Sequence, residues 1–402
     1  MHPDTMRFID RWVGIPLCFI TSLLLWKKKE TGSSKKVTDT IVFIGIAEIG
    51  ALVVAYPAVQ EARKQHPKSR ICFITAPTGK QTLELMGFDE KDILLIRTSS
   101  IQNILGDIVK IRNAFKRVSF SAVVLEPFAR FSTLVGAWIG ASKRIGCYRF
   151  LAEGVYLGNL LSHRLIYNPH LHASQTYFAL AKLLEEPESV EPSLKEVVAS
   201  QIGNRLRIEI PENDQHTLKQ QLQGEIPDFS LKKIVLLNAN ASDIVPLRKW
   251  SLSNFIELGK RLLENSEITV VLTGSLEEQE ACADLARKID TDRVINFAGK
   301  TTFQELITLY SLSDLLVTND SGPVHFASTT NLPVIALFGP ETPKIFGPMS
   351  PHAKVISLGL ACSPCISVFN QKKSSCTDNQ CMKQITVEMV IQETQKILRN
   401  ET

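Results

Sequence analysis

Excess charge is almost absent from the main part of this 402-residue sequence, whose formal net charge is only +4. Residues 1–36 hold seven Lys and Arg against three Asp and Glu, and the rest of the chain holds 38 of each kind. A nucleic-acid-binding protein usually presents a basic face, because its cations must neutralise phosphates. The sequence therefore gives no reason to expect nucleic acid as a partner.

Apolar runs long enough to cross a bilayer are not evident either. Residues 12–26 form an uncharged apolar segment of fifteen residues. As a helix it would extend about 22 Å, which is less than the roughly 30 Å of a hydrocarbon core. Lysines follow it instead of the small residues of a cleavage site, so it is not expected to direct export. We expect this segment to lie in a membrane interface.

The flanks of that segment support the same expectation. Arg7 and Arg11 precede it, Lys27 to Lys29 follow it, and a tryptophan stands at each end. Cations of this kind favour an anionic cytoplasmic leaflet, and tryptophans favour the headgroup zone. Residues 7–29 are therefore predicted to contact a membrane surface. The alternative is a helix docked on the protein body.

From residue 40 onward, short apolar runs of strand type alternate with amphipathic helical patterns. This alternation predicts an α/β fold with parallel sheets covered on both faces, and the length predicts two such domains. The Pro- and Glu-rich stretch near residues 185–232 is the best place for a junction. The predicted parts are a basic apolar segment (1–36), an N-terminal domain (37–200), a linker region (201–232), a C-terminal domain (233–385) with a Cys-rich loop (360–382), and a C-terminal helix (386–402).

Two loops stand where a parallel sheet binds ligands, at the carboxyl ends of predicted strands. The first follows residues 40–44 and reads GIAEIG, which has glycines but is not a complete GxGxxG motif. The second follows residues 314–318 and contains Asp320, Ser321, Gly322, Pro323 and His325. Ser or Asp before Gly-Pro is typical of a helix start, whose amides can bind an anion. An ordinary capped helix remains the alternative.

Three cations of the N-terminal domain are candidates for contact with an acidic ligand: Arg130, Lys143 and Arg144. Solvated surface positions remain the alternative for each of them.

Several segments together resemble glycosyltransferase family 9, the ADP-heptose:lipopolysaccharide heptosyltransferases. The resemblance lies in DSGPVHFASTTNLPVIALFGPETPKIFGP (320–348), RKWS (248–251), TGSLEEQE (273–280), FAGKTTFQEL (297–306) and GIAEIGALVVAYPAV (45–59), and covers nearly all of residues 40–395. It implies a GT-B fold, in which two Rossmann-like parallel-sheet domains face each other across a cleft. It also implies an inverting, metal-independent transfer of a heptose from ADP-heptose.

The resemblance also implies roles for individual residues. The acceptor would be held by the N-terminal domain, and the donor by the C-terminal one. Arg248 or Lys249 matches the cation that meets the donor phosphates, and Glu278, after Thr273 and Gly274, stands where a carboxylate reaches the nucleoside. The donor-binding turn matches Asp320, Ser321, Gly322, Pro323 and His325.

The sequence departs from the family at the expected catalytic base. Family members carry an Asp six residues before a proline, and counting back from Pro57 gives Ala51. Alanine cannot accept a proton, so Glu48 in the same loop becomes the candidate base. An exposed loop glutamate without a catalytic role is the alternative.

Four of the eight cysteines form a C-x2-C-x10-C-x4-C pattern. This spacing could hold a structural zinc ion or an iron–sulfur cluster, or it could mark disulfides or plain thiols. Because the family's transfer needs no metal, a metal here would be structural. The candidate ligands are Cys362, Cys365, Cys376 and Cys381.

These features predict a glycosyltransferase that is cytoplasmic, peripheral to the inner membrane, and acts on a lipopolysaccharide-core or other lipid-linked glycan acceptor. Two alternatives stay open: a transferase that uses another nucleotide sugar, and a membrane-tethered sugar-nucleotide-binding protein without turnover. The C-terminal helix is expected to cross back to the first domain.

Overall fold

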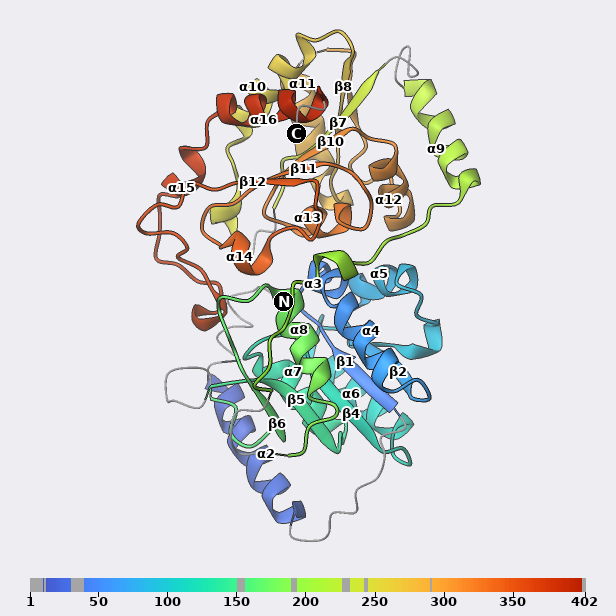
Figure 1. Ribbon diagram of the computed structural model, residues 1–402, viewed down its shortest axis with the longest axis vertical. Coiled ribbons are helices and arrows are strands. Elements are labelled where there is room, and N and C mark those ends of the chain that lie inside the picture. The colour runs from blue at the N-terminus through green and yellow to red at the C-terminus, as the bar shows by residue number, and fades with distance from the viewer. Residues whose placement is uncertain are drawn as a thin grey trace. The chain divides into compact units, whose positions relative to one another are not determined.

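The computed structural model describes residues 10, 12–29, 40–149, 156–188, 194–225, 232–241, 245–289 and 291–399. The chain divides into two compact units, Met1–Asn204 and Arg205–Thr402 (Figure 1). The division falls inside the region 201–232 that the sequence marks as a linker. Each unit is an α/β domain built on its own parallel sheet.

Unit 1 contains a six-stranded sheet in the order β3-β2-β1-β4-β5-β6, and every neighbouring pair is parallel. Its strands are β1 (Thr40–Ile44), β2 (Arg70–Thr75), β3 (Ile93–Leu95), β4 (Phe120–Val124), β5 (Lys143–Tyr148) and β6 (His163–Ile166). Its helices are α2 (Gly14–Lys29), α3 (Ile49–Val54), α4 (Tyr56–Gln65), α5 (Lys80–Leu85), α6 (Ile101–Ala114), α7 (Arg130–Trp138) and α8 (Ala173–Lys182).

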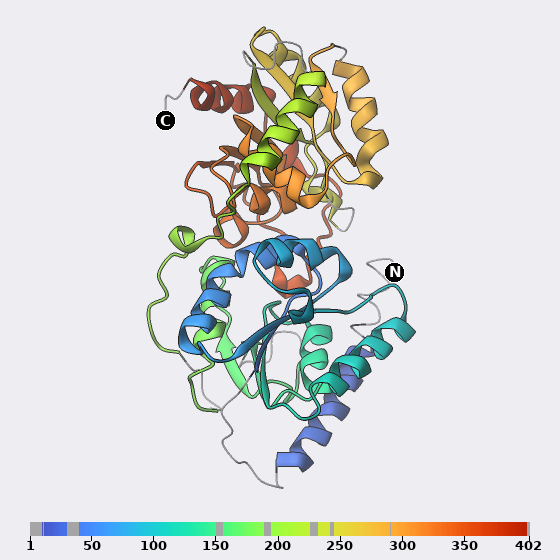
Figure 2. The same cartoon turned by 90° about the vertical axis from the view of Figure 1, so that its right-hand side faces the viewer.

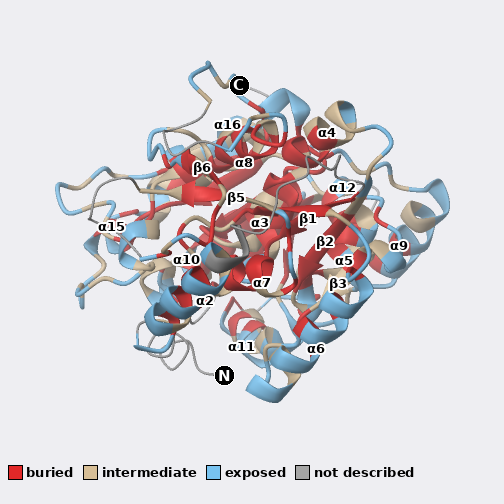
Figure 3. Cartoon of the chain, turned by 90° about the horizontal axis from the view of Figure 1, so that it is seen from below, coloured by how far each residue is buried: buried red, intermediate tan, exposed pale blue. Residues whose placement is uncertain are grey.

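Both faces of this sheet are covered, as the continuous apolar strands predict. Side chains of a strand alternate between the two faces, and Val42 and Ile44 turn toward Ile108 of α6 and Val135 of α7. Helices α4 and α8 pack together on the opposite face (Figure 3). The helical stretch after β1 is interrupted just before Pro57: α3 ends at Val54 and α4 begins at Tyr56.

Helix α2 lies outside α7 as an extra layer. Its docked side carries small or polar residues, namely Cys18, Thr21 and Ser22. The hydroxyl of Thr21 accepts a 3.0 Å hydrogen bond from the Trp138 indole, and the hydroxyl of Ser22 accepts one of 2.9 Å from the Asn159 amide. The structure thus contains the docked helix that was the alternative to membrane contact.

The outward side of α2 is apolar. Phe19 is 54% exposed, Leu24 64% and Trp26 62%. None of the helices in the described ranges combines the length and the apolar character that crossing a bilayer requires. Contact between this outward side and a membrane surface stays a prediction.

Unit 2 repeats the topology of unit 1 with a parallel sheet in the order β12-β11-β10-β7-β8-β9. Its strands are β7 (Lys233–Asn238), β8 (Ile268–Leu272), β9 (Val294–Asn296), β10 (Leu315–Asn319), β11 (Val334–Leu337) and β12 (Ala353–Ile356). Its helices are α9 (Glu212–Glu225), α10 (Leu252–Leu263), α11 (Gln279–Ile289), α12 (Phe303–Ser311), α13 (Gly322–Ala327), α14 (Pro343–Phe346), α15 (Gln380–Lys383) and α16 (Val387–Leu398).

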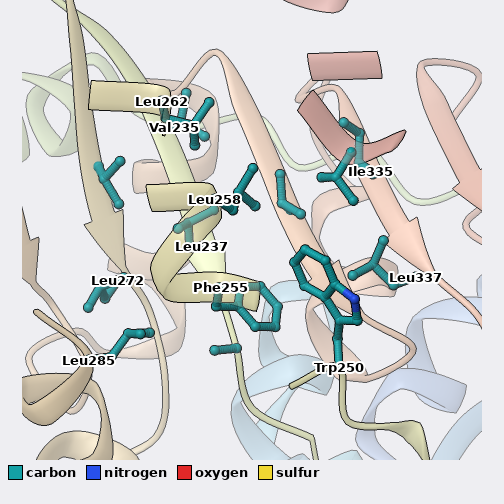
Figure 4. Packing of buried hydrophobic residues seen from close by; sticks show 14 of the residues in the cluster. Val235, Leu237, Trp250, Phe255, Leu258, Leu262, Leu272, Leu285, Ile335 and Leu337 are labelled. Carbon is teal, nitrogen blue, oxygen red and sulfur yellow. The ribbon is translucent and has the colours of Figure 1, made fainter. Parts of the chain in front are cut away.

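The core of unit 2 gathers around Trp250 and Phe255, whose rings meet edge to face at 5.0 Å (Figure 4). Helix α16 contributes Val390 and Ile391 to this core and packs against α10. The expectation that the last helix crosses to the first domain is therefore wrong. The apolar face of α16 packs against the sheet of its own unit.

One buried histidine of unit 1 should make stability depend on pH. Burial, followed by the charge of Lys143, lowers the pKa of His163 from 6.5 to about 4. Between pH 6.5 and about 4, His163 is therefore protonated in the unfolded chain but neutral in the folded chain. We expect the free energy of unfolding to fall as the pH drops through this window, by up to about 3 kcal/mol.

Urea unfolding at a series of pH values measures this effect. His163→Gln should flatten the pH dependence, whereas His170→Gln, at an exposed position, should leave it as in the wild type. An equally steep dependence in the His163→Gln variant would contradict the assignment.

Candidate functional site at the carboxyl ends of the strands

The two sheets share one topological feature that locates the candidate site. In each unit the chain order reverses between the first and the fourth strand, which are β1 and β4 in unit 1 and β7 and β10 in unit 2. Open parallel sheets bind ligands outside the carboxyl ends of the strands at such a point. Both sequence-predicted loops begin there, after β1 and after β10.

In unit 2 a buried amide ties the two strands together at this point. Asn319 is fully buried at the end of β10. Its side-chain nitrogen donates to the Ala239 carbonyl at 2.9 Å, and its side-chain oxygen accepts from the Trp250 amide at 3.0 Å. The Trp250 indole donates in turn to the Ile385 carbonyl at 2.8 Å. Asn319 therefore fixes the segment that carries Arg248 and Lys249 beside the end of β10.

The guanidinium of Arg248 lies between two buried carboxylates. Its Nε is 3.3 Å from Asp320, and its Nη2 is 3.1 Å from Glu341. Both carboxylates are nearly inaccessible to solvent, at 4% and 1% exposure. Arg248 and Asp320 were predicted as donor-binding residues, and the structure brings them together. Glu341, in the loop after β11, was missed, although it is a carboxylate that follows a strand of the same sheet edge.

The other predicted donor residues of unit 2 follow β8. Thr273 is tied to the end of β7, because Asn238 donates to its carbonyl at 3.0 Å. Glu278 accepts the Ser275 amide at 2.7 Å in a capping box that shapes the loop. A Cβ on Gly274 would stand 3.1 Å from the Glu278 carboxylate. Gly274 therefore permits the close approach of Glu278 to its own loop.

The turn after β10 opens α13 as the sequence predicts, with Pro323 in its first turn. The predicted side-chain cap is not formed: the Ser321 hydroxyl donates to the Asn319 carbonyl at 3.2 Å instead. A Cβ on Gly322 would lie 3.1 Å from the ring of Phe326. Gly322 and His325 are partly exposed.

In unit 1 a carboxylate just after the fourth strand has a role similar to that of Asn319. Glu126 follows β4, and its Oε1 accepts the Ile46 amide at 2.8 Å and the Ala47 amide at 2.5 Å. Its other oxygen accepts a hydrogen bond from the Ser132 hydroxyl. Glu126 thus holds the loop that follows β1. The candidate base Glu48 is exposed and is the last residue of that loop, directly before α3.

The environment of Glu126 raises the pKa of its carboxyl above the ordinary value. Burial raises its pKa, the nearby charge of Glu48 raises it further, and the hydrogen bonds from Ser132 and the two amides oppose this shift. Phe128, two residues after Glu126, has a φ of 60°, a conformation that a bulky side chain rarely adopts. Glu126 was not among the residues predicted from the sequence.

The predicted acceptor-binding cations are not brought together. Arg130 is buried at the start of α7, where its guanidinium binds Asp10 and the Tyr156 carbonyl. Lys143 and Arg144 open β5, so they lie at the amino edge of the sheet, opposite to the loop after β1. Lys143 donates to the Leu184 carbonyl at 2.6 Å, and Arg144 donates to that of Ala141 at 2.9 Å.

The four clustered cysteines are free thiols. Burial raises the pKa of Cys381, and the nearby Cys365 and Cys376 raise it further. The His, Cys, Asp and Glu side chains of the described residues nevertheless form no group arranged to hold a metal ion. The four-sulfur metal site, one of the alternatives for this spacing, is therefore not formed by these cysteines in the structure.

Replacing Asn319 by Asp should test how far unit 2 depends on this amide. The carboxylate keeps an acceptor for Trp250 but faces the Ala239 carbonyl with a negative charge. We expect a loss of about 2–4 kcal/mol in the free energy of unfolding, because a buried donor is lost and a charge is buried. Urea unfolding followed by tryptophan fluorescence measures it.

Asn265→Asp provides a matched control, because the exposed Asn265 uses only its side-chain oxygen, which accepts the Glu267 amide. An equal loss in both variants would show that Asn319 has no special role.

Comparison with known proteins agrees with the sequence resemblance. The sequence model of Glycosyltransferase family 9 (heptosyltransferase) matches residues 108–375. Lipooligosaccharide heptosyltransferase 2 of Campylobacter jejuni is 33% identical over 175 residues, which are 42% of this chain and 52% of that protein. Lipopolysaccharide heptosyltransferase 2 of Salmonella typhimurium is 29% identical over 182 residues, with 43% and 50% covered. The chain thus spans about half the length of these curated relatives.

The fold agrees as well. The structure of E. coli ADP-heptose lps heptosyltransferase II superposes with a TM-score of 0.68 at 22% identity, covering 90% of this chain and 99% of that one. This likeness confirms the predicted α/β fold of the GT-B class, with two Rossmann-like parallel sheets. Because the family model extends over more than half of the sequence, from α6 to the Cys-rich loop, the chain belongs to glycosyltransferase family 9, the heptosyltransferases.

Proposed function

We propose that this protein is an inverting glycosyltransferase that moves a heptose from ADP-heptose to a lipopolysaccharide-core or related glycan acceptor. The family match carries this proposal, because residues 108–375 include Arg248, Asp320 and Glu341. Transfer breaks the bond between the anomeric carbon and the diphosphate oxygen, and forms a bond from that carbon to an acceptor hydroxyl. The hydroxyl proton passes to a carboxylate, and ADP leaves with an added negative charge.

Arg248 and Lys249 are proposed to meet that developing charge. A guanidinium can give two parallel hydrogen bonds to a diphosphate, and such bonds strengthen as the oxygen gains charge. Asp320 and Glu341 hold the guanidinium in place before the donor arrives. We place the donor against the turn at Ser321, Gly322, Pro323 and His325, with its nucleoside near Thr273, Gly274 and Glu278.

Glu48 is proposed as the base. Glu126 supports this role by holding the amides of Ile46 and Ala47, which precede Glu48 in the chain. A carboxylate in an exposed loop is accessible to an acceptor hydroxyl. Ala51 at the usual base position favours the alternative of a sugar-nucleotide-binding protein without turnover.

The protein is also proposed to work at the cytoplasmic surface of the inner membrane, in contact through residues 7–29. The outward side chains of α2 support this, because large apolar residues are exposed along it. A lipid-linked acceptor would then be reached along the membrane surface.

Replacing Arg248 by Lys should weaken binding of ADP. Lysine keeps the charge but loses the bidentate geometry, so we expect a loss of about tenfold to a hundredfold, as charge-assisted hydrogen bonds are worth about 1.5–3 kcal/mol. Isothermal titration calorimetry with ADP measures this loss. Arg261→Lys is the control, because Arg261 pairs with Glu388 between α10 and α16. Equal affinities in the two variants would remove Arg248 from the phosphate site.

The base is tested by ADP release from ADP-heptose in the presence of a lipid A–core acceptor. Glu48→Gln should lower kcat by about a hundredfold or more, the contribution of a positioned base. Glu90→Gln, at an 81% exposed side chain, should have no effect. Glu126→Gln keeps acceptors for the two loop amides and should lose less than Glu48→Gln.

Two outcomes would change the proposal. Unaltered release by Glu48→Gln would exclude Glu48 as the base. Measurable binding but no release with any nucleotide sugar would favour the binding protein.

A further inference from the structure

The outward apolar side of α2 continues onto a second helix of unit 1. Helix α6 exposes Ile101 (59%), Leu105 (51%) and Val109 (55%) at intervals of four residues. Residues four apart on a helix lie on one side, so these three form a stripe. The adjoining side of α6 is buried in the sheet core through Ile108 and Ile111.

The stripe is turned toward α7. Arg112 lies eleven residues after Ile101, which is close to three full turns, so it stands on the same side of the helix. Its guanidinium donates to the Trp138 carbonyl at the end of α7 at 2.8 Å. The Trp138 indole donates to Thr21 of α2. Trp138 therefore connects α6 and α2, and α7 lies between them (Figure 3).

Helix α7 fills the space between the two apolar sides. Its Phe131 and Trp138 are partly exposed and seven residues apart, so they lie on one side of α7. Figure 2 shows α2 and α6 running along the same part of unit 1, in violet-blue and teal. We name this area the three-helix surface: the outward side chains of α2, Phe131 and Trp138 of α7, and Ile101, Leu105 and Val109 of α6.

The exposed charges of residues 101–117 are of one sign. Residues 101–117 contain four exposed cations, Lys110, Arg112, Lys116 and Arg117. The acid of this stretch, Asp107, is 7% exposed and bound by Arg97 at 2.8 Å. The segment 12–26 has no charged residue, and Lys27, Lys28 and Lys29 follow it in the sequence. Apolar side chains bordered by cations suit an anionic bilayer better than a second, equally basic copy of the chain.

We propose that the three-helix surface binds an anionic phospholipid bilayer, and that α6 is a second contact beside α2. This proposal rests on the membrane association proposed above, and extends it from one terminal segment to the folded domain. Two contacts on one rigid unit fix how that unit is turned on the bilayer, which a single helix does not. The apolar side chains enter the interface, and the cations meet lipid phosphates.

Binding of the full chain to vesicles tests the proposal, with phosphatidylglycerol mixed into phosphatidylcholine and with phosphatidylcholine alone. The triple change Ile101→Gln, Leu105→Gln and Val109→Gln keeps good helix formers and should weaken sedimentation with anionic vesicles at least about tenfold. The triple change Phe19→Gln, Ile20→Gln and Leu24→Gln tests α2 separately. Ile166→Gln, Val197→Gln and Ile202→Gln, at exposed positions outside the three helices, form the control and should bind as the wild type does.

The outcomes separate the two proposals. A loss in the α2 variant with none in the α6 variant overturns the second contact and leaves the terminal one. No loss in either variant overturns both. Equal binding to both kinds of vesicle overturns the assignment of anionic lipid.

Light scattering identifies the competing occupant. A wild-type dimer that the α6 variant converts to monomer, without a change in vesicle binding, would show an interface between two copies and overturn the proposal. Thermal unfolding confirms that each variant is folded. ADP release with a soluble acceptor should be unchanged in the α6 variant, so the enzymatic proposal is judged independently.

Discussion

The hydrogen bonds of one buried amide hold the candidate donor site together. Asn319 joins the end of β10 to the segment after β7, and through Trp250 it also reaches the chain before α16. Arg248 lies two residues before Trp250, so its position beside Asp320 depends on this anchor. Without this anchor the backbone at Arg248 would not be fixed, and its guanidinium would not be held between Asp320 and Glu341.

In unit 1 a different side chain binds the loop that follows the first strand. Glu126 stands after the fourth strand of its sheet, as Asn319 ends the fourth strand of the other, and each binds the loop after the first strand. An amide can both donate and accept, so Asn319 is satisfied without charge. An ionised carboxylate can only accept hydrogen bonds, so Glu126 accepts them from two amides and a hydroxyl. These bonds lower its pKa, but the effect of burial is larger, and the pKa is raised.

The sequence predicted what depends on local pattern. Apolar runs located strands such as β1 and β10, and Gly322-Pro323 located the start of α13. Contacts between residues far apart in the sequence are not visible in any local pattern. The pairing of Arg248 with Glu341 joins residues 93 positions apart, and Asp10 reaches Arg130 across 120. Lys143 and Arg144 bind backbone carbonyls at the amino edge of their sheet, and no local pattern predicts those partners. Glu126 was overlooked because nothing local distinguishes a glutamate that binds a distant loop.

The docking of α2 has a consequence for how the chain is made. The hydrogen-bond partner of Thr21, Trp138, is synthesised 117 residues later, and that of Ser22, Asn159, 137 residues later. At roughly 5–20 residues per second, a ribosome needs about 6 to 27 seconds to supply these partners. During that interval every side of an apolar segment is uncovered. The order of synthesis therefore exposes α2 to chaperones before its own domain can cover it.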